Sequence, residues 1–316
     1  MNISAIIVTY NRPDALEVIL RSILAQRELP GEVVIADDGS GAATAGVINS
    51  YRSRFPVPLK QVWHEDRGFR GAAIRNRAIR ESTGDYLVFS DGDLLFHPSF
   101  FRDFRRMAAP GSASIASRVF LTRPFTEKLL RNHTPIATAL NLVHHESFSP
   151  ENGFSSKPFS EPEPHSQSEA WHIPAKGISL PGLFSSGIEM NRINGWRMPF
   201  LAPLMPALSF SERLRGGLLG VWRKDLEAVN GWNEDFSGWG LEDTELVARL
   251  HFSGVSLRKL KFAAVCYHLW HPVADRQHLQ SNRELLRETI QKGLCHCNNG
   301  LFPPETPFPG EPSGRL

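Results

Sequence analysis

The chain has little of what marks several specialised classes of protein. Its 316 residues include 3 cysteines, an odd number that does not suit a disulfide framework in a chain of this length. Its 35 basic and 33 acidic side chains leave a formal charge of +2, which argues against a dedicated nucleic-acid-binding protein but leaves local basic patches open. No uninterrupted apolar stretch approaches the roughly 18 residues of a membrane-spanning helix. A globular protein of one long domain or two modest ones remains.

Two further features are missing near the ends of the chain. MNISAIIVTYNRP enters an apolar run at once, without a basic leader or a small-residue cleavage site, so we expect no signal peptide and a cytoplasmic protein. Cys295, His296 and Cys297 are adjacent, unlike the CxxC spacing of a zinc knuckle, and Cys266 supplies no second pair. We therefore favour reduced thiols over a zinc site.

What is present is an alternation of short apolar runs with amphipathic stretches. Residues 3–8 are rich in β-branched side chains and predict a buried strand, and residues 14–26 carry apolar side chains at helical spacing. The alternation predicts further strands at 32–36, about 59–63 and 86–90, with helices up to about 54 and at 72–82. Strands that alternate with helices imply right-handed crossovers and an α/β fold, with a mostly parallel sheet covered on both faces.

The regular pattern weakens in the middle of the chain. From about residue 110 to 215 the sequence is rich in Pro, Ser, Phe and His, which predicts an irregular region with a lid or acceptor loop around 149–169. Regular signals return at 216–232, and the final LFPPETPFPGEPSG predicts disorder. We divide the chain at these changes, into residues 1–110, 111–213, 214–290 and a tail at 291–316.

Polar clusters follow three of the predicted strands. TYNR, DDGS and SDGD fall where strands leave the sheet, and ligands of such sheets bind beyond the carboxyl ends of the strands. In SDGD, Asp91 and Asp93 flank Gly92, which lets the backbone turn tightly with both carboxylates on one side. Such a pair suits Mg²⁺ or Mn²⁺. A helix cap or a turn is the alternative, and each needs only one acid.

A second pair of acids opens a predicted helix. In FSGWGLEDTELVARL, residues 236–250, Glu242 and Asp243 precede apolar residues at helical spacing. Acids in a first helical turn interact favourably with the helix dipole, whereas a carboxylate held there could equally act as a general base. The residues alone leave both readings open.

Together these motifs resemble the family 2 glycosyltransferases of GT-A fold, with the C-terminal module found in β-1,4-galactosyltransferases and bacterial chondroitin polymerase. AIIVTYNRP, VVIADDGS, GFRGAAIRNRAI and SDGD match the nucleotide-sugar half, and GGLLGVWRKDLEAVNGWNEDFSGWGLEDTEL matches the acceptor and catalytic half. The match covers most of residues 1–110 and 214–285 and leaves the middle unmatched. It implies a Rossmann-like, mostly parallel sheet flanked by helices.

The resemblance also implies roles in binding a nucleotide sugar. Thr9, Tyr10 and Arg12 would line the nucleotide, and Asp38 would hydrogen-bond the uracil or ribose. Arg75 would lie near the pyrophosphate. The full set that the resemblance implies is Thr9, Tyr10, Arg12, Asp38, Arg75, Asp91, Gly92 and Trp239, the last as an aromatic wall of the sugar site.

A metal site is implied as well. Asp93 would be a direct ligand of Mn²⁺ or Mg²⁺, and Asp91 would touch the metal or the ribose. The family supplies a histidine ligand, for which CYHLWHP offers His268 and His271. We prefer His268 because it follows the predicted strand KFAAVCY. A buried histidine bonded to backbone is the alternative.

The resemblance implies an inverting transfer from a UDP-sugar. Asp243 would remove the proton of the acceptor hydroxyl as that oxygen attacks, and Glu242 would contact the acceptor or orient the loop. The metal would stabilise the departing diphosphate. The acceptor would be a glycan or a lipid-linked saccharide.

Two other classes stay open. A non-catalytic nucleotide-sugar-binding protein would need neither the metal pair nor the acids at 242 and 243. A nucleotidyltransferase would call for a glycine-rich phosphate loop after the first strand, and TYNRPDA has no glycine.

Residues 100–131 raise the question of membrane contact. Seven basic residues accompany only two acids there, Asp103 and Glu127. This stretch either rests peripherally on anionic lipid or is a basic surface over its own aromatic core. Its aromatic residues are Phe100, Phe101, Phe104, Phe120 and Phe125.

Overall fold

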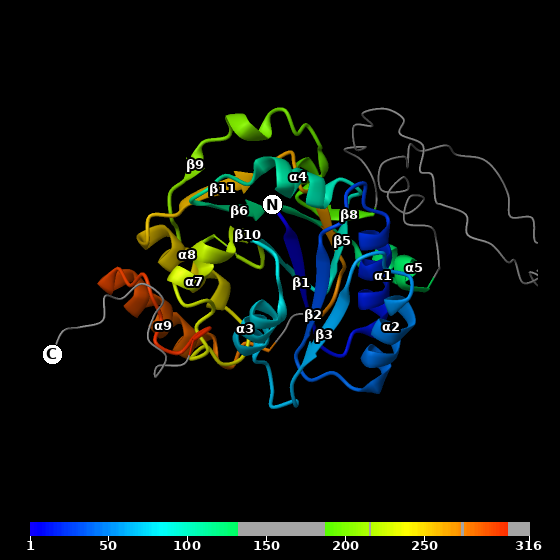
Figure 1. Ribbon diagram of the computed structural model, residues 1–316, viewed down its shortest axis with the longest axis horizontal. Coiled ribbons are helices and arrows are strands. Elements are labelled where there is room, and N and C mark those ends of the chain that lie inside the picture. The colour runs from blue at the N-terminus through cyan, green and yellow to red at the C-terminus, as the bar shows by residue number, and fades with distance from the viewer. Residues whose placement is uncertain (132–186, 215, 273–274, 303–316) are drawn as a thin grey trace, which may run out of the picture.

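The structure is a computed structural model that describes residues 1–131, 187–214, 216–272 and 275–302. Strands run through its middle, with helices on both sides (Figure 1). The candidate lid at residues 149–169 lies outside the described residues.

The first hundred residues form the elements that the sequence predicts. Each predicted strand and helix is confirmed to within a few residues, because each apolar run is long enough to show its period. The predicted elements are β1 (Ile3–Thr9), α1 (Pro13–Leu24), β2 (Glu32–Asp37), α2 (Ala42–Arg52), β3 (Leu59–Trp63), α3 (Gly71–Glu81) and β4 (Tyr86–Asp91). They are followed by β5 (Leu94–Phe96) and α4 (Phe100–Met107), which were not predicted.

The larger sheet combines strands from both ends of the chain. Among the described residues its order is β3-β2-β1-β4-β10-β6-β11-β9. The first four strands are parallel, but β10 lies antiparallel between β4 and β6, and β9 is antiparallel to β11. The later strands are β6 (Ser112–Ala116), β9 (Ala207–Leu208), β10 (Leu218–Trp222) and β11 (Ser256–Leu260).

Both faces of this sheet are buried. Along β1, Ile3, Ala5 and Ile7 pack into one apolar cluster and Ile6 into the other, as the period of two in a strand requires. Helices α1 and α2 cover one face, and α3, α7 (Arg223–Ala228) and α8 (Glu242–Phe252) cover the other (Figure 1). The prediction of a sheet covered on both sides is confirmed.

The prediction of an irregular region from about residue 110 is wrong for its first part. Residues 112–131 form β6, β7 (Arg118–Leu121) and α5 (Arg123–Arg131), and β6 is a fully buried strand of the large sheet. Strands of four or five residues with serine and alanine are too short and too weakly apolar to show a period. Further on lie β8 (Ile188–Met190), η1 (Arg192–Gly195) and η2 (Ala202–Leu204).

A smaller sheet stands beside the carboxyl end of β4. Among the described residues its order is β5-β12-β7-β8, with β12 (Cys266–His268) antiparallel to β5 and parallel to β7. The run KFAAVCY is therefore not one strand, because only its last two residues belong to β12. Phe262 and Ala264 have positive φ angles of 68° and 48°, so they form turns instead.

The C-terminal segment also departs from its prediction, since a tail was expected from residue 291. Helix α9 (Leu279–Lys292) is followed by residues that pack on the fold as far as 302. Asn230 Nδ2 donates a hydrogen bond to Cys297 O at 2.8 Å, and Leu301 is 2% exposed.

The aromatic residues near α4 belong to the interior. Phe100, Phe101 and Phe104 are fully buried and Phe125 nearly so, so these side chains are not available for the lipid contact considered for residues 100–131. Of the two readings, the basic surface over its own aromatic core fits the structure. Among the described helices, none has the length and apolar character needed to cross a membrane.

Candidate active site

The predicted nucleotide-lining residues cluster where β1 and β2 end. Thr9 pairs with Asp37 at the ends of these strands, and Asp38 N donates to Thr9 O at 3.0 Å. Thr9 is 3% exposed and its hydroxyl has no hydrogen-bond partner among the described residues.

The other two residues of this set lie nearer the surface. Tyr10 is exposed and donates to Asp66 at 2.9 Å, while Arg12 pairs with Asp14 at 3.0 Å. Their roles toward a nucleotide stay predictions.

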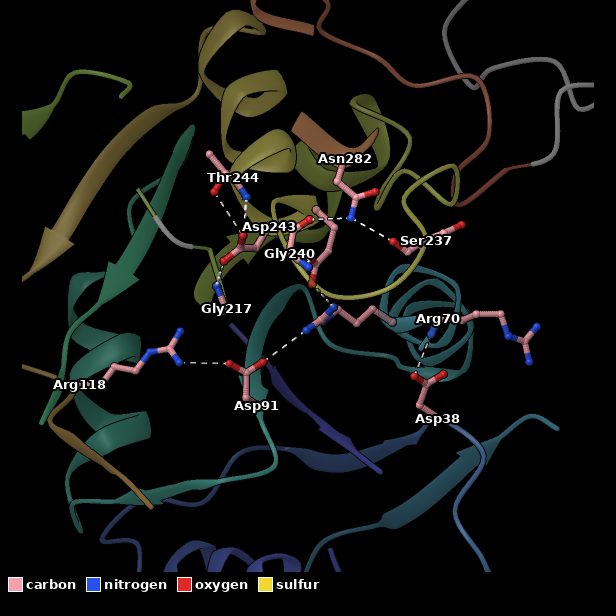
Figure 2. A network of polar contacts seen from close by, with 12 residues as sticks. Asp38, Arg70, Asp91, Arg118, Gly217, Ser237, Gly240, Asp243, Thr244 and Asn282 are labelled. Carbon is pink, nitrogen blue, oxygen red and sulfur yellow. Dashed lines mark hydrogen bonds and ion pairs between the residues drawn. The ribbon is translucent and has the colours of Figure 1, made fainter. Parts of the chain in front are cut away.

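Asp38 is held on both sides by the fold. His64 Nε2 lies 2.6 Å from Asp38 Oδ1. Arg70 N donates to Asp38 Oδ2 at 2.9 Å, as Figure 2 shows. Desolvation raises the pKa of Asp38, and the bonds from Arg70 and His64 oppose it. A base or ribose would therefore meet a carboxylate whose orientation is already fixed.

Asp91 lies between two arginines. Arg75 Nη2 on α3 is 3.3 Å from Asp91 Oδ1, and Arg118 Nη1 on β7 is 3.3 Å from Asp91 Oδ2 (Figure 2). Desolvation raises the pKa of Asp91, against the opposing charge of Arg118. Asp91 is thus an ion-paired acid with cations on both of its oxygens.

Gly92 is fixed by the close approach of β1. A Cβ at this position would lie 2.3 Å from Val8 O and 3.2 Å from Thr9 Cα. Only glycine lets the turn after β4 pass so close to the end of β1, which brings the acids on either side of it next to the predicted nucleotide site.

Asp93 faces two histidines of β12 and the residues that follow it. His268 Nε2 and His271 Nε2 lie 3.3 Å and 3.0 Å from Asp93 Oδ2. Together they offer three ligand atoms that all lie within 4.8 Å of one another. The sequence favoured His268, but the structure brings both histidines to the same carboxylate.

Asp93 and its two histidines shift one another's pKa values. Desolvation acts to raise the pKa of Asp93, but the hydrogen bond with His271 and the charges of both histidines bring it below its usual value. Burial lowers the pKa of His268, which favours the neutral imidazole that a metal requires. The bond to Asp93 raises the pKa of His271.

Glu242 is the buried member of the pair that opens α8. Arg75 Nη1 lies 3.4 Å from Glu242 Oε1, and Gly240 N donates to Glu242 Oε2 at 3.2 Å. Desolvation, with the nearby charge of Asp243, raises the pKa of Glu242 to about 7. Arg75 therefore contacts both Asp91 and Glu242, and its guanidinium also lies 4.4 Å from the Trp232 ring.

Asp243 is half-buried and fixed by main-chain donors. Gly217 N donates to Asp243 Oδ2 at 3.0 Å, and Thr244 N donates to Asp243 Oδ1 at 2.7 Å (Figure 2). These bonds orient the carboxylate in the first turn of α8, where the helix dipole favours an acid. The same side chain remains partly open to solvent, so a ligand could reach it.

Trp239 lies on the loop that precedes α8. Its side chain is 41% exposed, and the Arg276 guanidinium lies 5.7 Å from its ring. Its exposed ring could form the wall of a sugar site. This role of Trp239 stays a prediction.

Comparison with known proteins agrees with the motifs. Residues 4–155 match the family model described as glycosyl transferase family 2, and residues 203–272 match the one described as the N-terminal domain of galactosyltransferase. The first half of the chain is therefore similar to glycosyltransferase family 2, and part of the second half to galactosyltransferases. The resemblance stated from the motifs is confirmed.

Two curated relatives show the extent of the similarity. Validoxylamine A glucosyltransferase of Streptomyces hygroscopicus subsp. limoneus is 28% identical over 262 residues, covering 81% of this chain and 49% of the relative. Chondroitin synthase of Escherichia coli is 24% identical over 270 residues, covering 84% of this chain and 34% of the relative. The chain thus spans about half the length of the first relative and a third of the second.

Solved structures support the fold. S. aureus TarS 1–349 in complex with UDP superposes with a TM-score of 0.54 at 13% identity, covering 90% of this chain and 64% of that chain. The full TarS structure gives 0.53 at 15% identity, covering 92% and 40%. The predicted GT-A fold is confirmed.

Two residues of the site were not predicted, and a third was ranked second. Arg118 and His64 lie outside the matched motifs, and a lone basic side chain carries no period or spacing to mark it. His271 was weighed and ranked second, because the length of the preceding strand was overestimated.

Proposed function

We propose that this chain is a metal-dependent, inverting glycosyltransferase that uses a UDP-sugar. The observation that carries this proposal is the meeting of two acidic sites at one edge of the sheet. The first site is Asp93 with its two histidines, and the second is the pair of acids at the start of α8. Arg75 links them, because its guanidinium lies 3.3 Å from Asp91 and 3.4 Å from Glu242. A binding protein would need no second acidic site there.

The residues around Asp93 fit a divalent metal. Asp93 Oδ1 is buried and has no hydrogen-bond partner among the described residues, so a ligand site is left open on this carboxylate. With His268 and His271 it forms a mixed oxygen and nitrogen donor set. Because Mg²⁺ prefers oxygen ligands, these two imidazoles favour Mn²⁺.

When bound, Mn²⁺ or Mg²⁺ would act as a Lewis acid for the diphosphate of the donor. The chain's own residues would orient the donor. Thr9, Tyr10 and Arg12 would line the nucleotide, Asp38 would hold the uracil or ribose, and Gly92 would let β1 approach. Arg75 would bring a positive charge near the pyrophosphate, as its position beside Asp91 allows.

The half-buried Asp243 would act as the general base. Its two main-chain bonds fix the carboxylate, and its partial exposure lets an acceptor hydroxyl approach. Attack from the side opposite the leaving diphosphate is a single displacement, so the configuration at the anomeric carbon inverts. Glu242, buried against Arg75, would orient the loop or contact the acceptor, and Trp239 would stack on a sugar ring.

Donor and acceptor classes follow from relatives. One relative is named a glucosyltransferase and others chondroitin synthases, and TarS structures contain UDP or UDP-GlcNAc. These names support a UDP-sugar donor and a glycan acceptor, and a lipid-linked saccharide is the other acceptor class that we propose.

The test is UDP release from a panel of UDP-sugars, with a panel of simple glycosides as acceptors and with or without Mn²⁺. Metal-dependent release that an acceptor stimulates supports the proposal. Tight UDP binding without release would indicate a binding protein, and release of pyrophosphate from nucleoside triphosphates would indicate a nucleotidyltransferase.

A further inference from the structure

Helix α9 lies outside both family matches, which end at residues 155 and 272. It nevertheless contacts the loop at residues 237–240, which carries Trp239 and leads into Glu242 and Asp243. We infer that Asn282 of α9 is a positioning residue that holds this loop in the shape needed to bind the acceptor. The inference rests on the proposed function, in which the loop and the start of α8 serve the acceptor.

Asn282 holds the loop at two points. It is 1% exposed, and its Nδ2 donates to Ser237 O at 3.0 Å and to Gly240 O at 2.9 Å. Figure 2 shows this amide reaching both carbonyl groups. Since Gly238 and Trp239 lie between the two acceptors, one side-chain amide fixes both ends of the short segment that presents the tryptophan.

Other contacts hold the same segment from different sides. Gly238 N donates to Phe69 O at 3.3 Å, and Gly240 N donates to Glu242 Oε2 at 3.2 Å. The loop is therefore fixed by the nucleotide half, by α8 and by α9. Of these anchors, Asn282 is the one that comes from a part of the chain neither family match covers.

Helix α9 is itself fixed on α8, so Asn282 has a firm base. Thr289 Oγ1 donates to Glu245 Oε1 at 3.2 Å, and Leu286 is 1% exposed. Glu245 in turn pairs with the fully buried Arg249 at 2.8 Å. Because these contacts lie further along α9 than Asn282, they can be weakened without removing the bonds to the loop.

The test compares Asn282→Ala with Leu286→Ala in the full chain. Both changes weaken the packing of α9, but only the first removes the donors to Ser237 and Gly240. Asn282→Asp is a third variant of the same shape, whose carboxylate cannot donate near neutral pH. Hydrogen exchange of residues 236–241 and UDP affinity with Mn²⁺ are measured for each, together with acceptor KM for the pair found by the panel assay.

We expect Asn282→Ala and Asn282→Asp to speed exchange in the loop and to raise acceptor KM at least 10-fold, with UDP affinity within 2-fold of the wild type. Leu286→Ala should lower the unfolding temperature but leave loop exchange and acceptor KM unchanged. Unchanged exchange in both Asn282 variants would overturn the inference. Equal effects in Leu286→Ala at equal loss of stability would also overturn it, because they would reflect helix packing alone.

Failure of the proposed function gives a different result. If the wild type releases no UDP from any donor, the enzymatic proposal fails, and loop exchange in the three variants still decides whether Asn282 holds residues 237–240.

Discussion

Asp91 and Asp93 are separated by one glycine yet meet different partners. Asp91 has an arginine at each oxygen, whereas Asp93 has two histidines at one oxygen and none of the described donors at the other. A side chain already paired with two cations is a poor ligand for a third, because like charges repel. Of the two acids, the geometry therefore favours Asp93 for a metal.

Removing the carboxylate of Asp93 should weaken metal-dependent binding of UDP. We expect Asp93→Asn to lower UDP affinity in Mn²⁺ by at least about 10-fold, the effect of losing even an outer-shell partner of a metal. Titration calorimetry with UDP, with and without Mn²⁺, measures the change. Asp85→Asn, at the other end of the β4 segment and exposed, is the control. Equal UDP affinity of the Asp93 variant with and without Mn²⁺ would support the assignment. Full retention of the wild-type dependence on Mn²⁺ would contradict it.

Asp243→Asn tests the general base. The amide keeps the shape of the side chain but cannot take a proton, so we expect transfer to fall by about 10²–10⁴-fold. UDP affinity should stay within about 2-fold because, in the described residues, Asp243 contacts α8 and Gly217 and not the predicted nucleotide side chains. Near wild-type turnover would eliminate Asp243 as the base and direct attention to Glu242.

Glu242 gives a prediction about pH. Its pKa is raised from 4.5 to about 7 by desolvation first and by Asp243 second. The folded state therefore favours the protonated acid, and the stability this gives is present below about pH 4.5 and lost as the pH rises through 7. Glu242→Gln stays neutral, so its unfolding free energy relative to the wild type should rise between pH 5 and 8, by up to about 3 kcal/mol.

Urea unfolding at a series of pH values measures this difference. Glu284→Gln, the same chemical change at an exposed position on α9, is the control. A flat curve for Glu242→Gln would show that the carboxylate is not held neutral by burial.

The site was predictable in part. Asp91, Asp93, Glu242 and Asp243 stand in short patterns that a single sequence displays. Arg118 could not be found, because its place in the site depends on the pairing of β7 with β12, two strands from distant parts of the chain. Long-range pairing of this kind leaves no local signal.

Among the strands, dependence on long-range pairing also separates the confirmed predictions from the missed ones. β1, β2 and β4 each have four or more apolar or β-branched residues buried on both faces, which makes a continuous run. β9 has 2 residues and β12 has 3, too few for any period. These short strands exist because neighbouring strands pair with them, which only the tertiary fold decides.

Strand β10 offers a test of packing at this scale. A Cβ at Gly220 would lie 2.5 Å from Tyr86 Oη and 2.6 Å from Phe104 Cδ1, both in fully buried side chains. Gly220→Ala should therefore lower the unfolding free energy by about 1–3 kcal/mol, seen as a lower melting temperature. Gly46→Ala, inside α2 with nothing within 4 Å, should instead stabilise by about 0.5–1 kcal/mol.

The two glycine variants make opposite predictions from the same chemical change. If Gly220→Ala were as stable as the wild type, the strand would have to lie further from α4 than it does here.

At the scale of the whole molecule, the segments on either side of the middle region share one sheet. β10, from residues 214–290, pairs with β4 along Leu218 to Trp222, and it pairs with β6 on its other side. A strand paired on both sides is interior to the sheet, so removing residues 214–290 would expose an edge and the apolar face beneath α8. The division of the chain at residues 110 and 214 stays a prediction from the sequence. We expect the segments on either side of the middle region to unfold together.

The guanidinium of Arg75 bridges these segments by contacting one acid from each, and it follows that the two acids are thermodynamically coupled. In a double-mutant cycle, Asp91→Asn and Glu242→Gln should be non-additive, with an interaction energy of about 0.5–3 kcal/mol in urea unfolding. Each single change leaves Arg75 one carboxyl partner, whereas the double variant leaves the cation buried against Trp232 with neither. Strict additivity would mean that the arginine serves the two halves of the molecule independently.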